Sequence, residues 1–374
     1  MRKLFSRLTW LAAGALLALI LLEGAFRLLP VSMGLHRTEQ FKRWPLEAYQ
    51  PGQRYTYSKS WQFLNVRHGV TNNYGHPASF DYRQRSHPVV VIGDSFVESL
   101  MNSYEDTLQG QLGARLGSRE SVYGLGFAGL SASDFLALSR LARDEFAPTA
   151  AVFVIIDGDF SESLLPGLGT YHFVPQGDSF RLAYLPLHGE TLLKAVRGKI
   201  GEMSFYRYIF GNLGFSLDSV VKFSRTKEQS KSERDASDPA LLRRVIDYFL
   251  AELPSAIGVP AQCIAFLLDS DRYAIYKPES ASVPKETPEI RRYFLDQAER
   301  LGFAASNLDP VFRARYASEH AKFDYWPNDR HWNRTGHGVA ADEAYRLLFG
   351  AGKRECLPSM DRPRANPSQP YASP

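Results

Sequence analysis

The stretch Val89-Val90-Val91-Ile92-Gly93-Asp94-Ser95-Phe96 decides the fold of this 374-residue chain. A short, wholly apolar run that is rich in β-branched residues predicts a buried strand of a parallel sheet. In open α/β sheets the functional groups lie just beyond the carboxyl ends of such strands, and Ser95 falls at that point. Gly93 permits a sharp turn because it has no Cβ. A helix that starts after the turn would direct free backbone N–H groups at the serine oxygen and favour a developing anion.

A second stretch, Asp329-Arg330-His331-Trp332-Asn333-Arg334-Thr335-Gly336-His337, supplies partners for a serine nucleophile. Its histidine, His331, can act as a base, and Asp329 can orient the imidazole. Taken alone, Gly-Asp-Ser also fits an ordinary strand-to-helix turn capped by Asp94 or Ser95. A histidine before a helix likewise fits a buried structural role. Together the two stretches favour a catalytic triad in the chain order Ser, Asp, His.

With both stretches in hand, the chain resembles the SGNH/GDSL hydrolase superfamily from about Thr71 to Leu348. The Asp-x-His-Trp form of residues 329–332 is similar to the motif of its membrane-anchored bacterial branch, which includes the alginate O-acetylation proteins. The resemblance implies a flavodoxin-like three-layer α/β/α fold, serine ester chemistry and a periplasmic catalytic domain. Independently of the resemblance, strands that alternate with helical stretches of ten or more residues predict a parallel sheet with helices on both faces.

The resemblance also implies an oxyanion hole. Its donors would be the backbone N–H groups of Ser95 and Gly129, a glycine that lets the backbone approach the substrate oxygen closely. A third block of the superfamily is usually Gly-Asn-Asp, and its Asn side chain is a further donor. Aligned on Asp159, this chain has Asp157 and Gly158 there instead. Losing such a donor costs about 100- to 1000-fold in turnover unless the N–H of Gly158 replaces it. We expect Gly158→Asn to raise or at least to retain turnover.

Other polar residues are candidates for lining the substrate site. His172 lies in an expected insertion at about 164–238, which is interrupted by Pro and Gly and could form a lid or shape the acceptor pocket. Residues 269–272 follow another expected strand, where capping and ion pairing are favoured over substrate binding. We expect a structural role for His337, because its spacing from the other histidine fits no zinc motif. The substrate-binding candidates are Asp94, Asp157, Asp159, His172 and Trp332, although Trp332 alone would be an ordinary core aromatic.

Residues 1–30 are expected to form a membrane anchor. As a helix, Leu8 to Leu29 would reach roughly 33 Å, enough to cross a bilayer. Within it, Glu23 and Arg27 are four residues apart and can pair on one helix face. A cleaved signal peptide is the alternative. A short basic N-terminus ahead of a large domain favours N-in, C-out. The expected location is therefore the bacterial inner membrane, single-pass, with the catalytic domain facing the periplasm.

Composition limits the remaining possibilities. A hydrophobic content of 44% supports one large domain, expected at 86–349, and the scattered basic residues behind a net charge of +4 give no support for nucleic-acid binding. Two cysteines predict neither a disulfide framework nor a zinc site, and we expect no metal and no cofactor. The aromatic-rich residues 31–85 are expected to be a connecting arm that packs on the domain, rather than an exposed groove for sugar. Residues 350–374 are expected to be a disordered tail.

Three functions are compatible with this sequence. The favoured one is an O-acetyl esterase or O-acetyltransferase that acts on a cell-surface or exported polysaccharide, with polysaccharide-assembly proteins as candidate partners. A lipid or small-ester hydrolase is the second, although the insertion is not notably apolar. The third is a non-catalytic glycan-binding or assembly component that keeps the fold, for which the missing Asn of the third block is the main argument.

Overall fold

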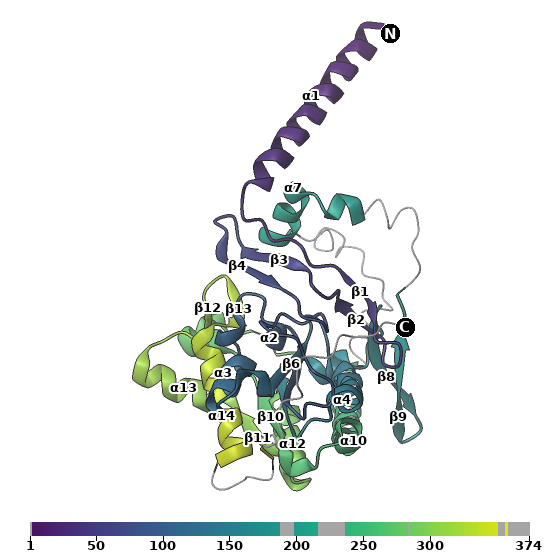
Figure 1. The fold of residues 1–374 in the computed structure, drawn as a ribbon. Coiled ribbons are helices and arrows are strands. Elements are labelled where there is room, and N and C mark those ends of the chain that lie inside the picture. Colours follow the sequence, from purple (N-terminus) through teal and green to yellow (C-terminus); the bar gives the residue numbers. More distant parts are fainter. Residues whose placement is uncertain (1, 188–197, 216–235, 283, 351–355, 358–374) are drawn as a thin grey trace, which may run out of the picture.

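A five-stranded parallel sheet lies at the centre of the computed structural model, which describes residues 2–187, 198–215, 236–282, 284–350 and 356–357 (Figure 1). The strand order is β11-β10-β7-β5-β6, and every pairing is parallel. When the five strands are numbered 1 to 5 along the chain and the order is read from β6 to β11, it is 2-1-3-4-5, the flavodoxin-like order. The predicted parallel α/β sheet is thus confirmed. The strands are β5 (Val89–Gly93), β6 (Val122–Gly126), β7 (Ala150–Ile155), β10 (Ile264–Leu268) and β11 (Ala304–Asn307).

Helices cover both faces of the sheet (Figure 1). On one face α3 (Leu108–Arg115) packs against α14 (Arg334–Phe349), and on the other α4 (Ala132–Phe146) packs against α10 (Pro239–Ile257), which meets α12 (Pro288–Arg300). This arrangement follows from right-handed crossovers that run in opposite directions from β5. The shorter helices are α2 (Ser95–Glu98), α5 (Asp159–Glu162), α11 (Arg272–Tyr276) and α13 (Leu308–Glu319), and the 3₁₀ turns are η1 (Tyr104–Asp106), η2 (Arg119–Ser121), η5 (Ala261–Cys263) and η6 (Pro278–Ser280).

The sequence between the N-terminal helix and the sheet forms two small antiparallel sheets of its own. One pairs β1 (Arg37–Gln40) with β2 (Leu46–Tyr49), and the other pairs β3 (Arg54–Lys59) with β4 (Leu64–Val70). The aromatic residues that follow pack on the domain: the Tyr82 ring stacks on Tyr123 of β6 with centroids 4.1 Å apart, and Tyr74 meets Phe146 of α4 edge-on. These two aromatic residues of the arm therefore pack against the sheet and helix α4.

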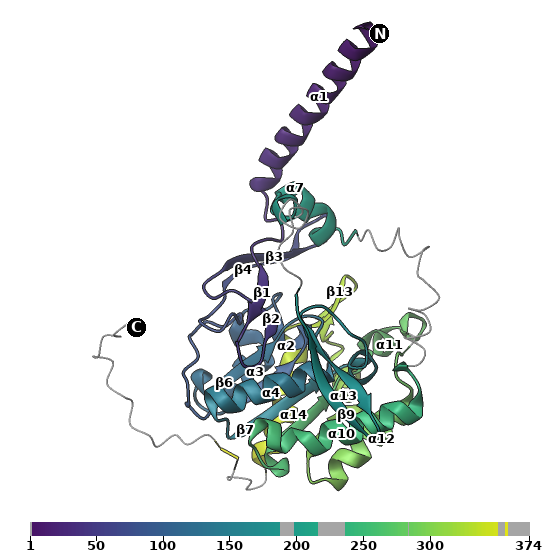
Figure 2. The same cartoon turned by 90° about the vertical axis from the view of Figure 1, so that its right-hand side faces the viewer.

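The N-terminal helix α1 (Arg2–Arg27) projects from the domain in both views (Figures 1 and 2). Within it, residues 9–27 have a mean hydropathy of 1.8 and are not buried against the rest of the protein. This helix is long and apolar enough to cross a membrane. The expected pair of Glu23 and Arg27 forms, with 2.8 Å between carboxylate oxygen and guanidinium nitrogen.

The expected insertion contains a hairpin and a helical segment. The hairpin pairs β8 (Thr170–Gln176) with β9 (Ser179–Leu185). The helical segment comprises α7 (Ser204–Arg207) and a following π-helical turn, η3 (Tyr208–Asn212), and it lies against the end of α1 (Figure 1). Residues 188–197 and 216–235 of the insertion, and most of the expected tail at 350–374, lie outside the described residues.

A disulfide joins Cys263 to Cys356, so the expectation that the two cysteines form no bridge is wrong. The residues are 93 positions apart, but their Cα atoms are 5.3 Å apart. Cys263 immediately precedes β10, and α14, which packs against that strand, brings the chain back to this edge. The pairing depends on the tertiary fold, which the spacing of two cysteines does not reveal. A hairpin of β12 (Asp324–Tyr325) and β13 (Asp329–Trp332) completes the described strands.

Candidate active site

Ser95 lies in a tight turn between β5 and α2. A Cβ at Gly93 would come within 2.6 Å of the Val97 side chain, so the turn requires glycine. The Asp94 side chain caps α2 by accepting a hydrogen bond from the N–H of Phe96 at 3.0 Å. Since β5 has β6 on one side and β7 on the other, Ser95 stands where the connections diverge to opposite faces of the sheet. Ligands of open α/β sheets bind at this point.

The β12–β13 hairpin brings the predicted acid and base to this serine. His331 Nε2 lies 2.8 Å from Ser95 Oγ, and His331 Nδ1 lies 2.6 Å from Asp329 Oδ1. The backbone N–H of His331 also donates to Asp329 Oδ1 at 3.0 Å. The side chain of Asp329 is 5% exposed and that of His331 is 28% exposed, so the base is open to solvent and the carboxylate is covered. The three residues therefore have the geometry of a nucleophile, its base and an orienting carboxylate.

The electrostatics of the pair favour an ionised carboxylate. Burial opposes the charged form of Asp329, but the hydrogen bond and positive charge of His331, together with the hydroxyl of Tyr57, hold the pKa of Asp329 well below its usual range. Burial also opposes the imidazolium, yet the hydrogen bond and charge of Asp329 and the charge of Asp94 raise the pKa of His331 above its ordinary value. The carboxylate thus stabilises the imidazolium that would form when His331 takes a proton.

Tyr57 is a site residue that the sequence did not reveal. It lies on β3, in the arm, and its hydroxyl donates a 2.6 Å hydrogen bond to Asp329 Oδ2, the oxygen that His331 does not use. Burial and the charge of Asp329 raise the pKa of the Tyr57 hydroxyl, so it stays a donor. The two residues are 272 positions apart, and no local pattern could have linked them.

Arg272 anchors the hairpin that carries the acid and base. Its buried guanidinium pairs with Asp269 and, at 3.3 Å, with Asp324 of β12. The neighbouring Asp271 caps α11 by accepting from the N–H of Tyr273. The interpretation of residues 269–272 as capping and ion-pairing groups is therefore confirmed.

Trp332 belongs to the same buried network. It is 0% exposed, its indole N–H donates to Asp269 Oδ1 at 2.9 Å, and its ring meets Phe96 edge-on at 5.1 Å. The prediction that Trp332 binds substrate is wrong, because the core encloses the ring completely. The ring packs β13, the strand that carries His331, against Phe96 of α2.

The glycines predicted for the oxyanion hole have different environments. The loop that carries Gly129 starts next to the nucleophile turn, since a Cβ at Gly126 would lie 2.9 Å from the carbonyl oxygen of Asp94. Gly129 itself is exposed, has φ +86°, and has open space where a Cβ would be. Gly158 is buried with φ +105°, and a Cβ there would come within 2.6 Å of Lys285. A side chain at Gly158 would point at Lys285, so Gly158→Asn is expected to strain the loop rather than add a donor.

The aspartates predicted to bind substrate have structural partners. Both carboxylate oxygens of Asp157 accept backbone N–H groups, from Lys285 at 2.7 Å and Glu286 at 3.0 Å. Asp159 is 1% exposed and accepts from the N–H of Ile156 at 2.8 Å. Burial, and secondarily the charge of Asp94, raise the pKa of Asp159 well above its usual range. Because Asp159 is enclosed, the substrate-binding prediction for it is wrong, whereas Asp157 is half-buried and substrate binding by it stays a prediction.

Asp94 acts on the site from behind the nucleophile. It is 4% exposed, and its Oδ2 accepts a 3.3 Å hydrogen bond from the Ser95 hydroxyl. Burial raises the pKa of Asp94 to about 6. The carboxylate therefore contacts the nucleophile and the start of α2. Because Asp94 is buried, the prediction that it contacts substrate is wrong.

The two remaining histidine predictions have different outcomes. His172 lies on β8, opposite Ala183 of β9, and the β8–β9 hairpin stands on a different side of the domain from β12–β13 (Figure 1). The structure therefore does not bring His172 to the triad. His337 is buried: its Nδ1 accepts from the N–H of Leu108 at 3.0 Å, and its Nε2 lies 2.9 Å from Ser99 Oγ. These contacts are structural, as expected. Within the described ranges, no three His, Cys, Asp or Glu side chains gather as a metal site.

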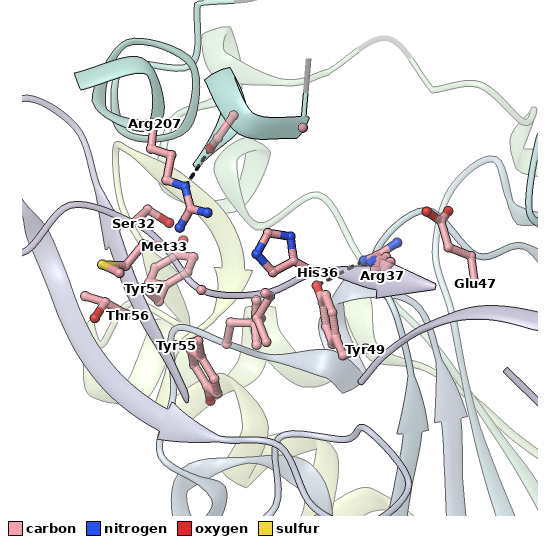
Figure 3. Close-up of a pocket in the computed structure, with 15 residues that line it drawn as sticks. Ser32, Met33, His36, Arg37, Glu47, Tyr49, Tyr55, Thr56, Tyr57 and Arg207 are labelled. Carbon is pink, nitrogen blue, oxygen red and sulfur yellow. Dashed lines mark hydrogen bonds between the residues drawn. The ribbon is translucent and has the colours of Figure 1, made fainter. Parts of the chain in front are cut away.

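A cavity of about 530 Å³ lies between the arm and the insertion, and Ser95, His331 and Asp329 are not among the residues that line it (Figure 3). Three tyrosines of the arm line it, and one of them is Tyr57, whose hydroxyl holds Asp329. Arg207 of α7 enters it from the insertion. Arg37 joins this wall to the nucleophile region, since its guanidinium pairs with Glu98 of α2 at 3.0 Å and donates to the carbonyl of Ala128 at 2.8 Å. The cavity is lined by His36, Arg37, Tyr49, Tyr55, Tyr57 and Arg207, among others.

No family model matches this chain, and no curated protein matches it. Among solved structures, it is similar to a protein described as lipolytic and of the G-D-S-L family from Desulfitobacterium hafniense DCB-2, at 12% identity and a TM-score of 0.36, covering 70% of this chain and 99% of that one. An alpha/beta hydrolase enzyme from the metagenome of Lake Arreo, Spain, has 15% identity and a TM-score of 0.37, with 71% and 96% covered. A salicylyl-acyltransferase from a tetracycline biosynthetic pathway has 14% identity and a TM-score of 0.32, with 72% and 56% covered.

Proposed function

We propose that this chain is a membrane-anchored serine esterase or O-acyltransferase of SGNH type. The hydrogen-bonded series Ser95 Oγ, His331 Nε2, His331 Nδ1 and Asp329 Oδ1 carries the proposal, with separations of 2.8 Å and 2.6 Å. In the proposed reaction, Ser95 Oγ attacks the ester carbonyl while His331 takes its proton. His331 then returns that proton to the leaving alcohol, and an acyl-serine remains. Water or a sugar hydroxyl, deprotonated by the same histidine, attacks the acyl-serine and releases Ser95.

The developing oxyanion would be held by backbone N–H groups. The proposed donors are Ser95, at the start of α2, and Gly129, which is exposed on a loop that begins beside the nucleophile turn. Neither donor depends on the missing Asn side chain of the third block. Removing one oxyanion donor typically costs about 100- to 1000-fold in turnover. We therefore propose a site that is slower than one with the full donor set but still able to turn over.

The proposed substrate is an O-acetylated polysaccharide at the cell surface or in export, met in the periplasm. The cavity lined by Tyr57, the residue that holds Asp329, supports a carbohydrate, because its tyrosines offer ring faces and its arginines offer guanidinium donors. The disulfide supports a compartment outside the cytoplasm, where such bridges persist. The apolar helix α1 supports attachment to the membrane from which the polysaccharide would be reached.

Fluorophosphonate labelling of the full chain in detergent tests the chemistry. We expect wild type to be labelled, and Ser95→Ala and His331→Ala to lose labelling while their circular dichroism and melting temperatures stay unchanged. Ser86→Ala is the matched control, because Ser86 is exposed and bonded only within its own loop and to Tyr123. Labelling that survives in Ser95→Ala would reject the triad. A folded wild-type protein without labelling would favour the non-catalytic glycan-binding alternative.

Acetate release identifies the substrate. Acetylated polysaccharides and small acetate esters are incubated with wild type and with Ser95→Ala, and released acetate is measured. We expect serine-dependent release from the polysaccharide to exceed release from simple lipid esters. The reverse order would favour the lipid or small-ester hydrolase.

A further inference from the structure

Large apolar side chains are exposed where α1 meets the domain. The set comprises Leu28 and Leu29 at the end of α1, Trp61 in the turn between β3 and β4, and Ile200, Leu213 and Phe215 around α7 and η3. We call these six residues the foot. Leu28 is 88% exposed, Trp61 66% and Phe215 63%. Single exposed apolar residues are normal on a soluble surface, but a group from three neighbouring segments indicates an interaction surface.

The three segments are packed together at the end of α1. The Glu23 carboxylate accepts from the N–H groups of Ser204 and Phe205 at 3.1 and 3.0 Å, which caps α7. The ring centroids of Phe26 and Tyr208 of η3 are 4.5 Å apart, and those of Tyr208 and Phe63 of the β3–β4 turn are 5.4 Å apart. The foot is therefore a packed extension of α1 and not a set of independent loops.

Asn212 ties this unit to the arm. It is 1% exposed, its Oδ1 accepts from the N–H of Ser32 at 2.9 Å, and its Nδ2 donates to Ser58 Oγ at 2.6 Å. Its carbonyl accepts from the N–H of Ser60 at 2.9 Å. A buried amide that is hydrogen-bonded through both its oxygen and its nitrogen fixes η3 on β3, the strand that also carries Tyr57. The position of the foot is thus coupled to the position of the catalytic hairpin.

We propose that the foot is seated in the headgroup layer of a lipid bilayer. Continuity with α1 identifies this occupant, because residues 9–27 are long and apolar enough to cross the bilayer and the foot begins where they end. Tryptophan is enriched at that level of membrane proteins. The exposed side chains of Arg27 and Lys199, 71% and 80% accessible, are placed to reach lipid phosphates. The proposal rests on the proposed membrane anchoring and not on the ester chemistry.

The foot would hold the cavity at the membrane surface. Arg207 of α7 and Met33 of the arm line the cavity, and both come from the segments that carry the foot. The wall of the cavity therefore combines residues of the foot's segments with Tyr57, which donates to Asp329.

Spin-label accessibility in nanodiscs tests the foot on the full chain. The two cysteines of the chain are joined in the disulfide, so one introduced cysteine is the sole free thiol. Trp61→Cys and Phe215→Cys report on two segments of the foot. Leu16→Cys in α1, 60% exposed, is the bilayer reference, and Leu301→Cys, 40% exposed before β11 at the opposite end of the sheet, is the aqueous reference. Power saturation with oxygen and with a nickel chelate is measured for each label.

We expect both foot labels to be several-fold less accessible to the nickel chelate than the Leu301 label, and to lie between it and the Leu16 label. If the foot labels are as accessible to the nickel chelate as the Leu301 label while the Leu16 label is shielded, the proposed lipid contact of the foot is wrong. The proposed membrane anchor would still hold. A Leu16 label with aqueous accessibility would overturn the anchor and the foot together. The use of two foot positions protects the test against one variant that does not fold. Fluorophosphonate labelling of the same samples reports separately on the ester chemistry.

Discussion

At the scale of single residues, His331 determines the pH range of the proposed activity. A general base must be neutral, and the pKa of His331 is raised above the ordinary value of 6.5 by its contacts with Asp329 and the charge of Asp94, which outweigh burial. Activity is therefore lost as the pH falls through this raised pKa and is complete above it. We expect kcat/KM for ester hydrolysis to rise with pH through a midpoint above 6.5. A midpoint below that value would contradict the raised pKa of His331.

Tyr57 offers a second test at this scale. Its hydroxyl holds Asp329 Oδ2, so its loss should leave that covered oxygen without its donor and let the carboxylate turn away from His331. A hydrogen bond to a charged group contributes about 1.5–3 kcal/mol, so we expect kcat/KM to fall about tenfold or more in Tyr57→Phe. Tyr74→Phe, which removes another tyrosine hydroxyl of the arm, bonded to Glu145 and outside the lining of the cavity, is the matched control. An equal change in both variants would indicate altered packing rather than positioning of Asp329.

At the scale of elements, Asn333 links the catalytic hairpin to the last helix. Its Oδ1 caps α14 by accepting from Thr335 and Gly336, and its Nδ2 donates to the carbonyl oxygens of Lys322 and Asp324 beside β12. Asn333→Ala removes both functions, and cap loss alone costs about 1 kcal/mol. We expect a lower melting temperature and a reduced kcat, since His331 is only two residues away.

Asn333→Asp separates the two functions of this side chain, because it keeps the cap acceptor and removes the amide donors. We expect its melting temperature to be close to wild type while kcat still falls. Thermal denaturation and ester turnover of the two variants are compared. If Asn333→Asp turns over at the wild-type rate, the amide donors do not position the hairpin.

The elements also show how far local sequence predicts this protein. The apolar run of β5 and the pattern around Ser95 predict the strand, the turn and the nucleophile, because each depends on neighbours in the chain. The short spacing of Asp329 and His331 is equally local. The contributions of Tyr57 and Trp332 depend on residues far away in sequence. The local sequence therefore gives no signal for the contact of Tyr57 with Asp329, and it led to the wrong prediction that Trp332 binds substrate.

At the scale of the whole molecule, the disulfide fastens the end of the sheet opposite the active site. Cys263 precedes β10 and Cys356 follows α14, so the bridge encloses β10, β11 and the β12–β13 hairpin within one covalent loop. The substrate side of the domain depends on elements inside this loop, including Arg272 and His331. Because such bridges persist in oxidising compartments, the same bond connects the stability of the fold with the proposed location.

The double variant Cys263→Ala/Cys356→Ala tests this connection. A bridge across 93 residues constrains the unfolded chain and typically stabilises by about 2–4 kcal/mol, so we expect the melting temperature to fall on the order of 10 °C. Wild type treated with a thiol reductant should fall similarly, whereas the double variant should not respond to it. If wild-type protein whose disulfide has been reduced melts at the same temperature as before, the bridge does not stabilise the fold. Ester turnover measured at 25 °C, below both transitions, should change little, because the bridge lies at the far end of the sheet from Ser95 and closes the structure without entering the site.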